Sequence, residues 1–299
     1  MLHELTAVLA ADLPSQDDAG KLAEVLYSRC YTRSVLDAPT DSAAAPQDLA
    51  AALAAANRSR PRWLEGWRVE QMLDDGRIVA ARSGFERAFL PGEYIAYRGI
   101  GTGLEKAAPI TVFNAAGSNQ VQPDFYYAFG EAVADFEWTG ATLRIYWNVQ
   151  PEGAPRLMEA ITRQFNRYQI PFRFKCLNDA SLFPRRDAAV LYFDRRYYRL
   201  AALLVESIHK EVLPRLSIGT PLFAKPLAPG LALAEDPGVS FGMHRCAILA
   251  AAMVASYGTP IEQRMAEVRR CFAERGLSLG SPWLNPNSAE AYGYPIESA

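Results

Sequence analysis

Two short segments alternate apolar side chains with polar or cationic ones. Residues 142–149 and 172–177 both follow this pattern. Because successive side chains of a β-strand point to opposite sides, each segment is predicted to be a strand with one apolar face and one polar face. The polar positions are Arg144, Tyr146 and Asn148 in the first segment, and Arg173 and Lys175 in the second.

If the two strands share a sheet, their cations converge on one surface. Arg185 and Arg186 come just before a third predicted strand, and Arg245 follows the small-residue turn at 240–242, near a predicted helix start. Arginine offers a planar fork for bidentate phosphate binding, and a helix N-terminus adds backbone N–H donors. The pattern therefore predicts a phosphate-binding pocket.

Lys175 is the candidate for chemistry within this set. Neighbouring cations favour its neutral amine, which can act as a general base, and Tyr146 could donate a proton to a leaving group. This set fits removal of an α-proton followed by loss of a β-phosphate. Hydrolysis fits less well, because no carboxylate cluster that could bind a metal and activate water is evident in the sequence.

The same residues also have plainer interpretations. Charged side chains on one face of a strand usually face solvent, and Arg185, Arg186 and Asp187 could form a surface ion pair. Ser240 is better interpreted as a helix cap than as a nucleophile, since no nucleophile-elbow motif surrounds it. For His244, a surface or structural role is favoured over a catalytic acid or a phosphate contact.

The elements that would carry these residues make an α+β protein, with a mixed or antiparallel sheet packed against helices. Residues 1–62 are predicted to be an N-terminal helical region and 63–299 an α+β catalytic domain. Within that domain, residues 66–114 are typical of an antiparallel meander. Apolar spacing predicts helices after residue 153 and at 198–213, 241–257 and 260–274, and an all-apolar strand at 188–193. Pro39–Pro46 and the glycine-rich Arg98–Gly103 are predicted to be loops.

Composition excludes several classes of protein. The chain has 299 residues, half of them hydrophobic, and a net charge of −2, so no global field attracts nucleic acid or an anionic membrane. There is no apolar run of transmembrane length and no secretory signal pattern, so we expect a cytoplasmic protein without membrane association. Four scattered cysteines and three histidines predict reduced thiols and no metal site.

Three stretches together resemble the HopA-type family of type III effectors. They are RIYWNV at 144–149, RFKCLNDASLFPRRDAAVLYFD at 173–194 and PLFAKPLAPGLALAEDPGVSFGMHR at 221–245. The resemblance covers roughly residues 120–257. Some members of this family are injected effectors of plant pathogens. Others belong to biosynthetic pathways for ribosomal peptides, such as class V lanthipeptides and thioamitides.

The biosynthetic members imply a phosphoserine/phosphothreonine lyase. There a kinase-like partner phosphorylates Ser or Thr of a precursor peptide, and the HopA-like protein eliminates the phosphate to leave dehydroalanine or dehydrobutyrine, without a cofactor. The distant resemblance to the phosphothreonine lyases OspF and SpvC implies a fold like theirs and Lys175 as the base. It implies Tyr146 at the position of the acid. The implied phosphate-binding residues are Arg144, Arg173, Arg186 and Arg245, with His244 as the other candidate acid.

Two alternatives stay open from the sequence. The cationic pocket could bind a phosphopeptide or an anionic partner without turnover, or the chain could be an injected effector with a host target. The N-terminal helical region could bind a kinase, a leader peptide or a secretion chaperone, or could be a structural cap.

Overall fold

The computed structural model contains two antiparallel sheets and seven α-helices in the residues that it describes, which are 1–15, 17–36, 48–82, 85–96, 104–132 and 142–295. The predicted α+β class is therefore confirmed. The predicted loops at 39–46 and 98–103 lie outside the described residues. Within the described residues, no helix combines the length and apolar character needed to cross a membrane.

The smaller sheet has five strands and its own apolar core. Its order is β3-β2-β1-β5-β4, with bounds β1 Arg62–Met72, β2 Ile78–Arg82, β3 Phe85–Phe89, β4 Tyr94–Ala96 and β5 Pro109–Asn114. Trp67, Val69 and Phe89 lie in its core. The predicted meander is present in β1–β3, whereas the pairing of β5 with β1 needs a long-range contact that local patterns do not encode.

The larger sheet carries the candidate chemistry. Its order is β11-β12-β8-β10-β9-β7-β6, and every pairing is antiparallel. The strand bounds are β6 Gly117–Ser118, β7 Phe125–Phe129, β8 Thr142–Trp147, β9 Phe172–Leu177, β10 Ala189–Asp194, β11 Lys225–Ala228 and β12 Leu231–Glu235. The central strand β10 is buried along its whole length, as its apolar composition predicted.

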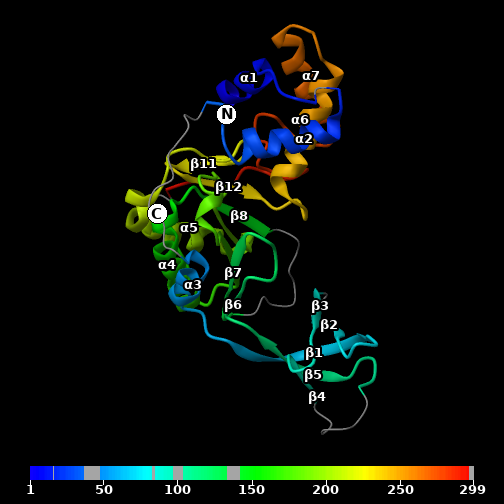
Figure 1. Ribbon diagram of the computed structural model, residues 1–299, viewed down its shortest axis with the longest axis vertical. Coiled ribbons are helices and arrows are strands. Elements are labelled where there is room, and N and C mark those ends of the chain that lie inside the picture. The colour runs from blue at the N-terminus through cyan, green and yellow to red at the C-terminus, as the bar shows by residue number, and fades with distance from the viewer. Residues whose placement is uncertain (16, 37–47, 83–84, 97–103, 133–141, 296–299) are drawn as a thin grey trace.

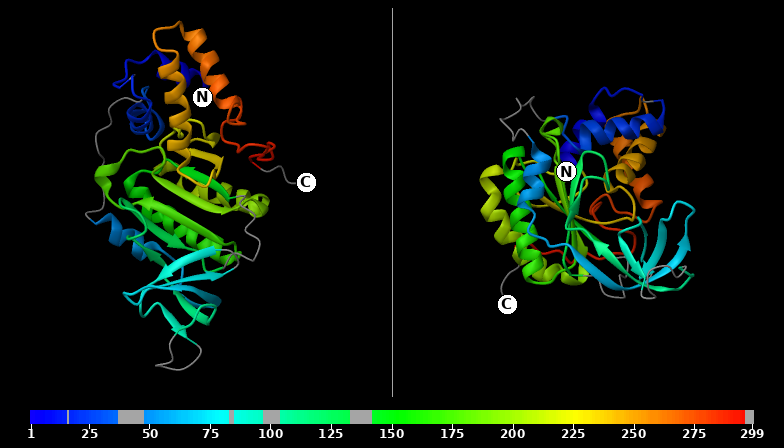
Figure 2. Two further views of the ribbon diagram at one scale, coloured as in Figure 1. Left: turned by 90° about the vertical axis from the view of Figure 1, so that its right-hand side faces the viewer. Right: turned by 60° about the horizontal axis from the view of Figure 1, so that its bottom comes forward.

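Helices cover both faces of the larger sheet, and Figure 2 shows the sheet between the two groups. One face packs on α3 Leu49–Ala56, α4 Ala154–Arg167 and α5 Tyr198–Val212. The other packs on α1 Leu2–Ala10, α2 Ala19–Leu26, the π-helical turn Tyr27–Tyr31, α6 Phe241–Ala255 and α7 Ile261–Ala273. The helices before residue 62 are thus divided between both faces, and the chain enters the smaller sheet only after them (Figure 1).

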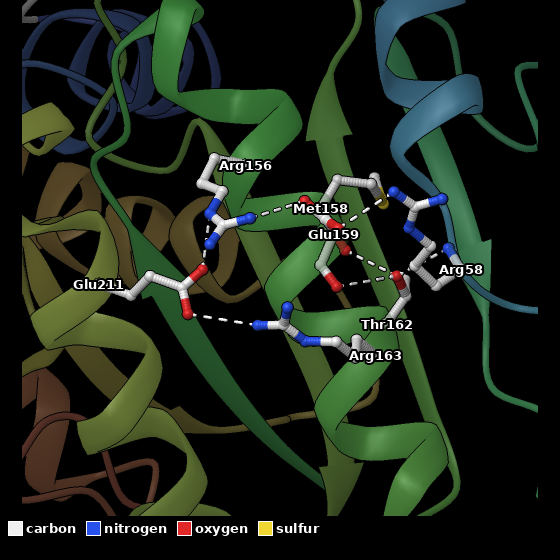
Figure 3. A network of polar contacts seen from close by, with 7 residues as sticks. All are labelled: Arg58, Arg156, Met158, Glu159, Thr162, Arg163 and Glu211. Atoms are coloured by element: carbon white, nitrogen blue, oxygen red, sulfur yellow. Dashed lines mark hydrogen bonds and ion pairs between the residues drawn. The ribbon is translucent and has the colours of Figure 1, made fainter.

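A polar network holds the segment between α3 and β1 against α4 (Figure 3). The backbone N–H of Arg58 donates to Thr162 Oγ1 at 2.9 Å, and its guanidinium pairs with Glu159 at 3.0 Å. Glu211 of α5 forms an ion pair with Arg156 of α4 at 2.7 Å. Because these ion pairs are partly exposed, each of them adds little stability.

The start of α6 lies directly on the aromatic rings of the π-helical turn. A Cβ atom at Gly242 would come within 2.5 Å of Tyr31 Cε1 and 2.7 Å of Tyr27 Cε2. Tyr31 is 2% exposed and has little room to move away. Glycine is therefore required here by close packing.

We predict that Gly242→Ala lowers the free energy of unfolding by about 1–3 kcal/mol, because overpacking outweighs the better helix propensity of alanine. Chemical denaturation would measure this. Gly293→Ala is the matched control, because no atom lies within 4 Å of the Cβ it would add. Equal transition midpoints for the two variants would contradict the prediction.

Candidate functional site

The sheet register brings the predicted cations onto one face. Arg144 of β8 and Arg173 of β9 are both partners of Tyr192 in β10, so the three residues form one row across the sheet. Tyr146 and Lys175 are likewise both partners of Val190 and form the next row. The rows are two residues apart along each strand, which is about 6.6 Å on the same face, so together they form one patch. We call Arg144, Tyr146, Arg173, Lys175 and Tyr192 the cationic face.

Tyr192 lies between the two arginines. The guanidinium carbon of Arg144 is 5.3 Å from the centroid of its ring, and that of Arg173 is 5.4 Å away. A ring face attracts a cation and offsets part of the cost of removing it from water. Tyr192 therefore allows two like charges to approach the same point of the sheet.

Arg173 is the open member of this face. Its side chain is exposed, and it makes no ion pair or hydrogen bond with the part of the chain that the structure describes. A guanidinium stacked on one ring and otherwise free can form a bidentate contact with a phosphate.

Arg144 is held on the opposite side of Tyr192. Its Nη2 donates to Asp236 Oδ1 and to the carbonyl of Val239, both at 2.7 Å. Asp236 begins the loop that leads from β12 to α6. Arg144 therefore connects the cationic face to this loop and meets a phosphate only in competition with a carboxylate.

Lys175 is half-buried among aromatic and amide groups. Its Nζ lies 4.1 Å from the centroid of the Phe125 ring and donates to Gln122 Oε1 at 3.0 Å. Among the described residues, no carboxylate forms an ion pair with it. Burial, together with the charges of Arg144, Arg185 and Arg173, lowers the pKa of Lys175 to about 8, although Asp187 favours the ammonium. The neutral amine of Lys175 is therefore far more populated near neutral pH than that of an ordinary exposed lysine.

The adjacent cation is Arg185. Its Nε and Nη2 form a bidentate pair with Asp187 at 2.9 Å each, and its guanidinium lies 5.7 Å from the Phe125 ring, which Lys175 also contacts. An arginine and an aspartate two residues apart can form this bidentate pair. The sequence indicated the pair, but it was interpreted as lying on the surface. Both residues are in fact largely buried.

Arg186 points to another part of the molecule. Its Nη1 donates to Glu4 Oε1 of α1 at 2.6 Å and to the carbonyl of Thr220 at 3.0 Å. Its guanidinium also packs on Gly219, where a Cβ atom would be 2.7 Å from Nε. Its described contacts tie α1 to the sheet, and Arg185 is the member of the pair that lies beside Lys175.

Arg245 is fully buried and bound to the backbone. Its Nε and Nη2 donate to the carbonyls of Pro282 and Leu284 at 2.8 and 2.9 Å, and its guanidinium lies over Phe241. Burial lowers its pKa to about 10. These contacts use Arg245 to anchor the segment after α7, so a phosphate contact would require that segment to move.

The two candidate acids have different surroundings. Tyr146 is 2% exposed, and its hydroxyl lies near Tyr31 and Arg144 without a hydrogen bond of normal geometry to any described residue. Burial raises its pKa, so it keeps its proton at neutral pH. His244 Nδ1 lies 2.6 Å from Arg245 Nη1, and burial together with Arg245 lowers the pKa of this histidine. It is therefore mostly neutral at pH 7.

The sequence interpretation missed several contributors to this site. Asn148, which the sequence placed on the polar face, follows the end of β8 and donates to the carbonyl of Gly219 at 2.9 Å, which is a structural contact. Gln122 and Phe125 lie outside the motifs, while Asp187 was considered only as a surface partner and Asp236 was given no role; each reaches the face from a connecting segment or a neighbouring strand. In the described parts of the chain, no group of three or more His, Cys, Asp or Glu side chains is arranged to hold a metal.

Comparison with known proteins gives a family match for the region that contains this site. The model of the HopA1 effector protein family matches residues 116–284. Two solved structures are similar, both titled as effector proteins of Pseudomonas syringae. That of pv. tomato strain DC3000 has 24% identity, a TM-score of 0.44, and coverage of 56% of this chain and 67% of that chain.

The second structure, from pv. syringae strain 61, has 20% identity and a TM-score of 0.41, and it covers 55% of this chain and 63% of that chain. This chain therefore spans only about two thirds of the effectors to which it is similar. No curated protein matches the chain. The smaller sheet lies before the matched region.

We predict that Asp187→Asn lowers the pKa of Lys175 below about 8, because the substitution removes the carboxylate that favours the ammonium and leaves the Arg185 charge in place. The pH dependence of Lys175 acylation, followed by peptide mass spectrometry, would measure it. Asp75→Asn in the smaller sheet is the control and leaves this pKa unchanged. A pKa of Lys175 that stays the same or rises in Asp187→Asn would contradict the assignment.

Proposed function

The chain belongs to the HopA1 effector protein family, and we propose that it is a lyase that eliminates phosphate from phosphoserine or phosphothreonine of a peptide. The observation that carries this proposal is Lys175. It is a half-buried amine with a pKa of about 8, on the same sheet face as Arg173, whose guanidinium forms no ion pair with any described residue. A base and an anion site in adjacent rows of one sheet face suit a substrate whose acidic C–H and phosphate belong to one residue.

The proposed reaction is a β-elimination. The neutral amine of Lys175 removes the α-proton, the electrons of that C–H bond form the Cα=Cβ double bond, and the Cβ–O bond breaks. The phosphate leaves with the bonding electrons. The products are a dehydroalanine or dehydrobutyrine residue and inorganic phosphate, and the proton taken by Lys175 returns to solvent. No oxidant or reductant is needed.

Arg173 is the proposed main phosphate contact. Its free fork can pair with two phosphate oxygens, and its ring contact with Tyr192 fixes the guanidinium. Arg144 assists if the phosphate displaces Asp236 from it. Arg185 adds positive potential near Lys175, partly offset by Asp187. We assign Arg186 and Arg245 structural roles in this proposal, because their donors are committed to Glu4, Thr220 and the segment after α7.

Tyr146 is the proposed acid in preference to His244. It lies in the same row as Lys175 and beside Arg144, and its buried hydroxyl stays protonated. A proton or a hydrogen bond from this hydroxyl would stabilise the charge that develops on the leaving oxygen. His244 belongs to α6 and is coupled to Arg245.

The family permits two biological settings for this chemistry. The substrate is a precursor peptide phosphorylated by a kinase-like partner in a biosynthetic pathway, or a host phosphoprotein if the chain is an injected effector. The charge of the cationic face suits both, and the biosynthetic setting is our primary proposal.

We predict that Lys175→Ala reduces elimination by at least about 10²-fold and leaves the fold intact, since a positioned base contributes about 10²–10⁴-fold. For the unaltered protein, the rate rises with pH through an apparent pKa of about 8, as the ammonium loses its proton. Mass spectrometry of a phosphopeptide would follow loss of phosphoric acid and subsequent thiol addition to the product.

Lys210→Ala, on α5 at the far face of the sheet, is the control and retains full activity. Normal turnover by Lys175→Ala would remove the base assignment. Conversion of the phosphopeptide back to its hydroxyl form would mean hydrolysis, and tight binding without any turnover would mean a non-catalytic phosphopeptide module.

We predict that Tyr146→Phe slows elimination by about 10²-fold or more while His244→Gln changes it only a few-fold, because only Tyr146 lies in the row of Lys175. Single-turnover rates with one phosphopeptide would measure both. The reverse order of effects would assign the acid to His244. Thermal unfolding of both variants controls for loss of fold.

A further inference from the structure

A glutamine in the loop between β6 and β7 is bonded to the candidate base. Gln122 Oε1 accepts a hydrogen bond from Lys175 Nζ at 3.0 Å and a second from the Tyr127 hydroxyl at 2.9 Å. Tyr127 is the cross-strand partner of Lys175 in β7. The amide oxygen of Gln122 therefore connects its loop to β7 through Tyr127 and to β9 through Lys175.

The two bonds occupy both lone pairs of that oxygen and hold its direction. Tyr127 is 8% exposed, so it provides a rigid second support for the amide. The Phe125 ring lies against Nζ from a third direction, at 4.1 Å from its centroid. A lysine side chain has several rotatable bonds, and here the position of its last atom is defined by an acceptor and a ring.

We propose that Gln122 is a positioning residue that aims the amine of Lys175 at the substrate, with Tyr127 holding the amide in place. A neutral amine still has two N–H bonds, and donation of one to Gln122 restricts where its lone pair can point. When the amine takes a proton, the same oxygen accepts from the ammonium. This inference deepens the proposed function and rests on it for the identity of the base.

The charged groups that face Lys175 are already accounted for. Asp187 raises its proton affinity, whereas Arg144, Arg185 and Arg173 lower it, and these groups come from β8, β9 and the segment before β10. None of them forms a direct hydrogen bond to Nζ among the contacts of the described residues. Gln122 therefore acts through contact, and the others act through charge at longer range.

The sequence offers a matched pair for the experiment, because Gln120 lies two residues away in the same loop. It is exposed, and its only described hydrogen bond is that of its backbone N–H to Ser118 Oγ at 3.0 Å. Gln122→Glu places a carboxylate at the position of the amide, while Gln120→Glu adds the same charge to the same loop outside contact with Lys175.

The first readout is the pH dependence of Lys175 acylation in the full-length protein, which needs no turnover. Gln122→Glu is expected to raise the pKa of Lys175 by at least about one pH unit, because a carboxylate at hydrogen-bond distance favours the ammonium. Gln122→Leu is expected to lower it. Gln120→Glu is expected to leave it within a few tenths, with unchanged thermal unfolding in all three variants.

The second readout is the elimination of phosphate and its pH profile. Gln122→Leu is expected to lower kcat by about 10-fold or more at the pH where Lys175 is neutral, with little change in KM, and Tyr127→Phe to give a smaller loss in the same sense. Gln122→Glu moves the rising limb of the profile to higher pH by the same amount as the acylation curve.

The outcomes separate this inference from the proposed function. Equal effects of Gln122→Glu and Gln120→Glu, or an acylation curve that does not respond to either Gln122 variant, would overturn the positioning role. A full response of the acylation curve in a protein that eliminates no phosphate would support the contact with Lys175 and overturn the lyase proposal instead.

Discussion

The candidate site depends on the pairing of β10 with both β8 and β9. β10 is buried along its whole length and carries no cation, and its Tyr192 falls between Arg144 of β8 and Arg173 of β9. A shift of the β9 pairing by one residue would turn Arg173 and Lys175 to the opposite, apolar face of the sheet, and the same shift of β8 would turn Arg144 there. The same strand register therefore decides both the packing of the apolar core and the position of the cations.

Placing several cations on a covered face is costly, and the protein offsets that cost in a different way for each. Arg144 is bound by Asp236 and Arg185 by Asp187, while Arg173 reaches solvent over the ring of Tyr192. Lys175 has the ring of Phe125 and a neutral amide. Burial disfavours its ammonium, and no carboxylate among the described residues binds it directly, so its proton is held weakly, which is the property that a base needs.

The helices of both chain ends close the same side of the sheet. α1 and α2 pack with α6 and α7, and the contacts of Arg186 with Glu4 and of Gly242 with Tyr31 are part of this closure. The first helices are thus integral to the sheet that carries the site. The smaller sheet is different, because it has its own core and precedes the region matched by the family.

The sequence by itself determined the local structure and the sidedness of the strands. The period-two alternation of 142–149 and 172–177 predicted both strands and the face that each cation occupies, and the apolar run predicted a strand covered on both sides. Those signals are local, since they depend only on backbone periodicity. The resemblance of three sequence stretches to the HopA-type family likewise indicated the family before the fold was known.

Only the tertiary structure decided which cations meet and what each of them binds. Adjacent arginines in Arg185-Arg186 diverge, one toward Lys175 and the other toward α1, and Arg245 is committed to backbone carbonyls nearly forty residues away in sequence. Gln122 lies outside every motif, and nothing in the motif around Asp236 indicates that it binds Arg144. Partners of this kind depend on long-range register and on the course of connecting segments, and neither leaves a periodic signal in the sequence.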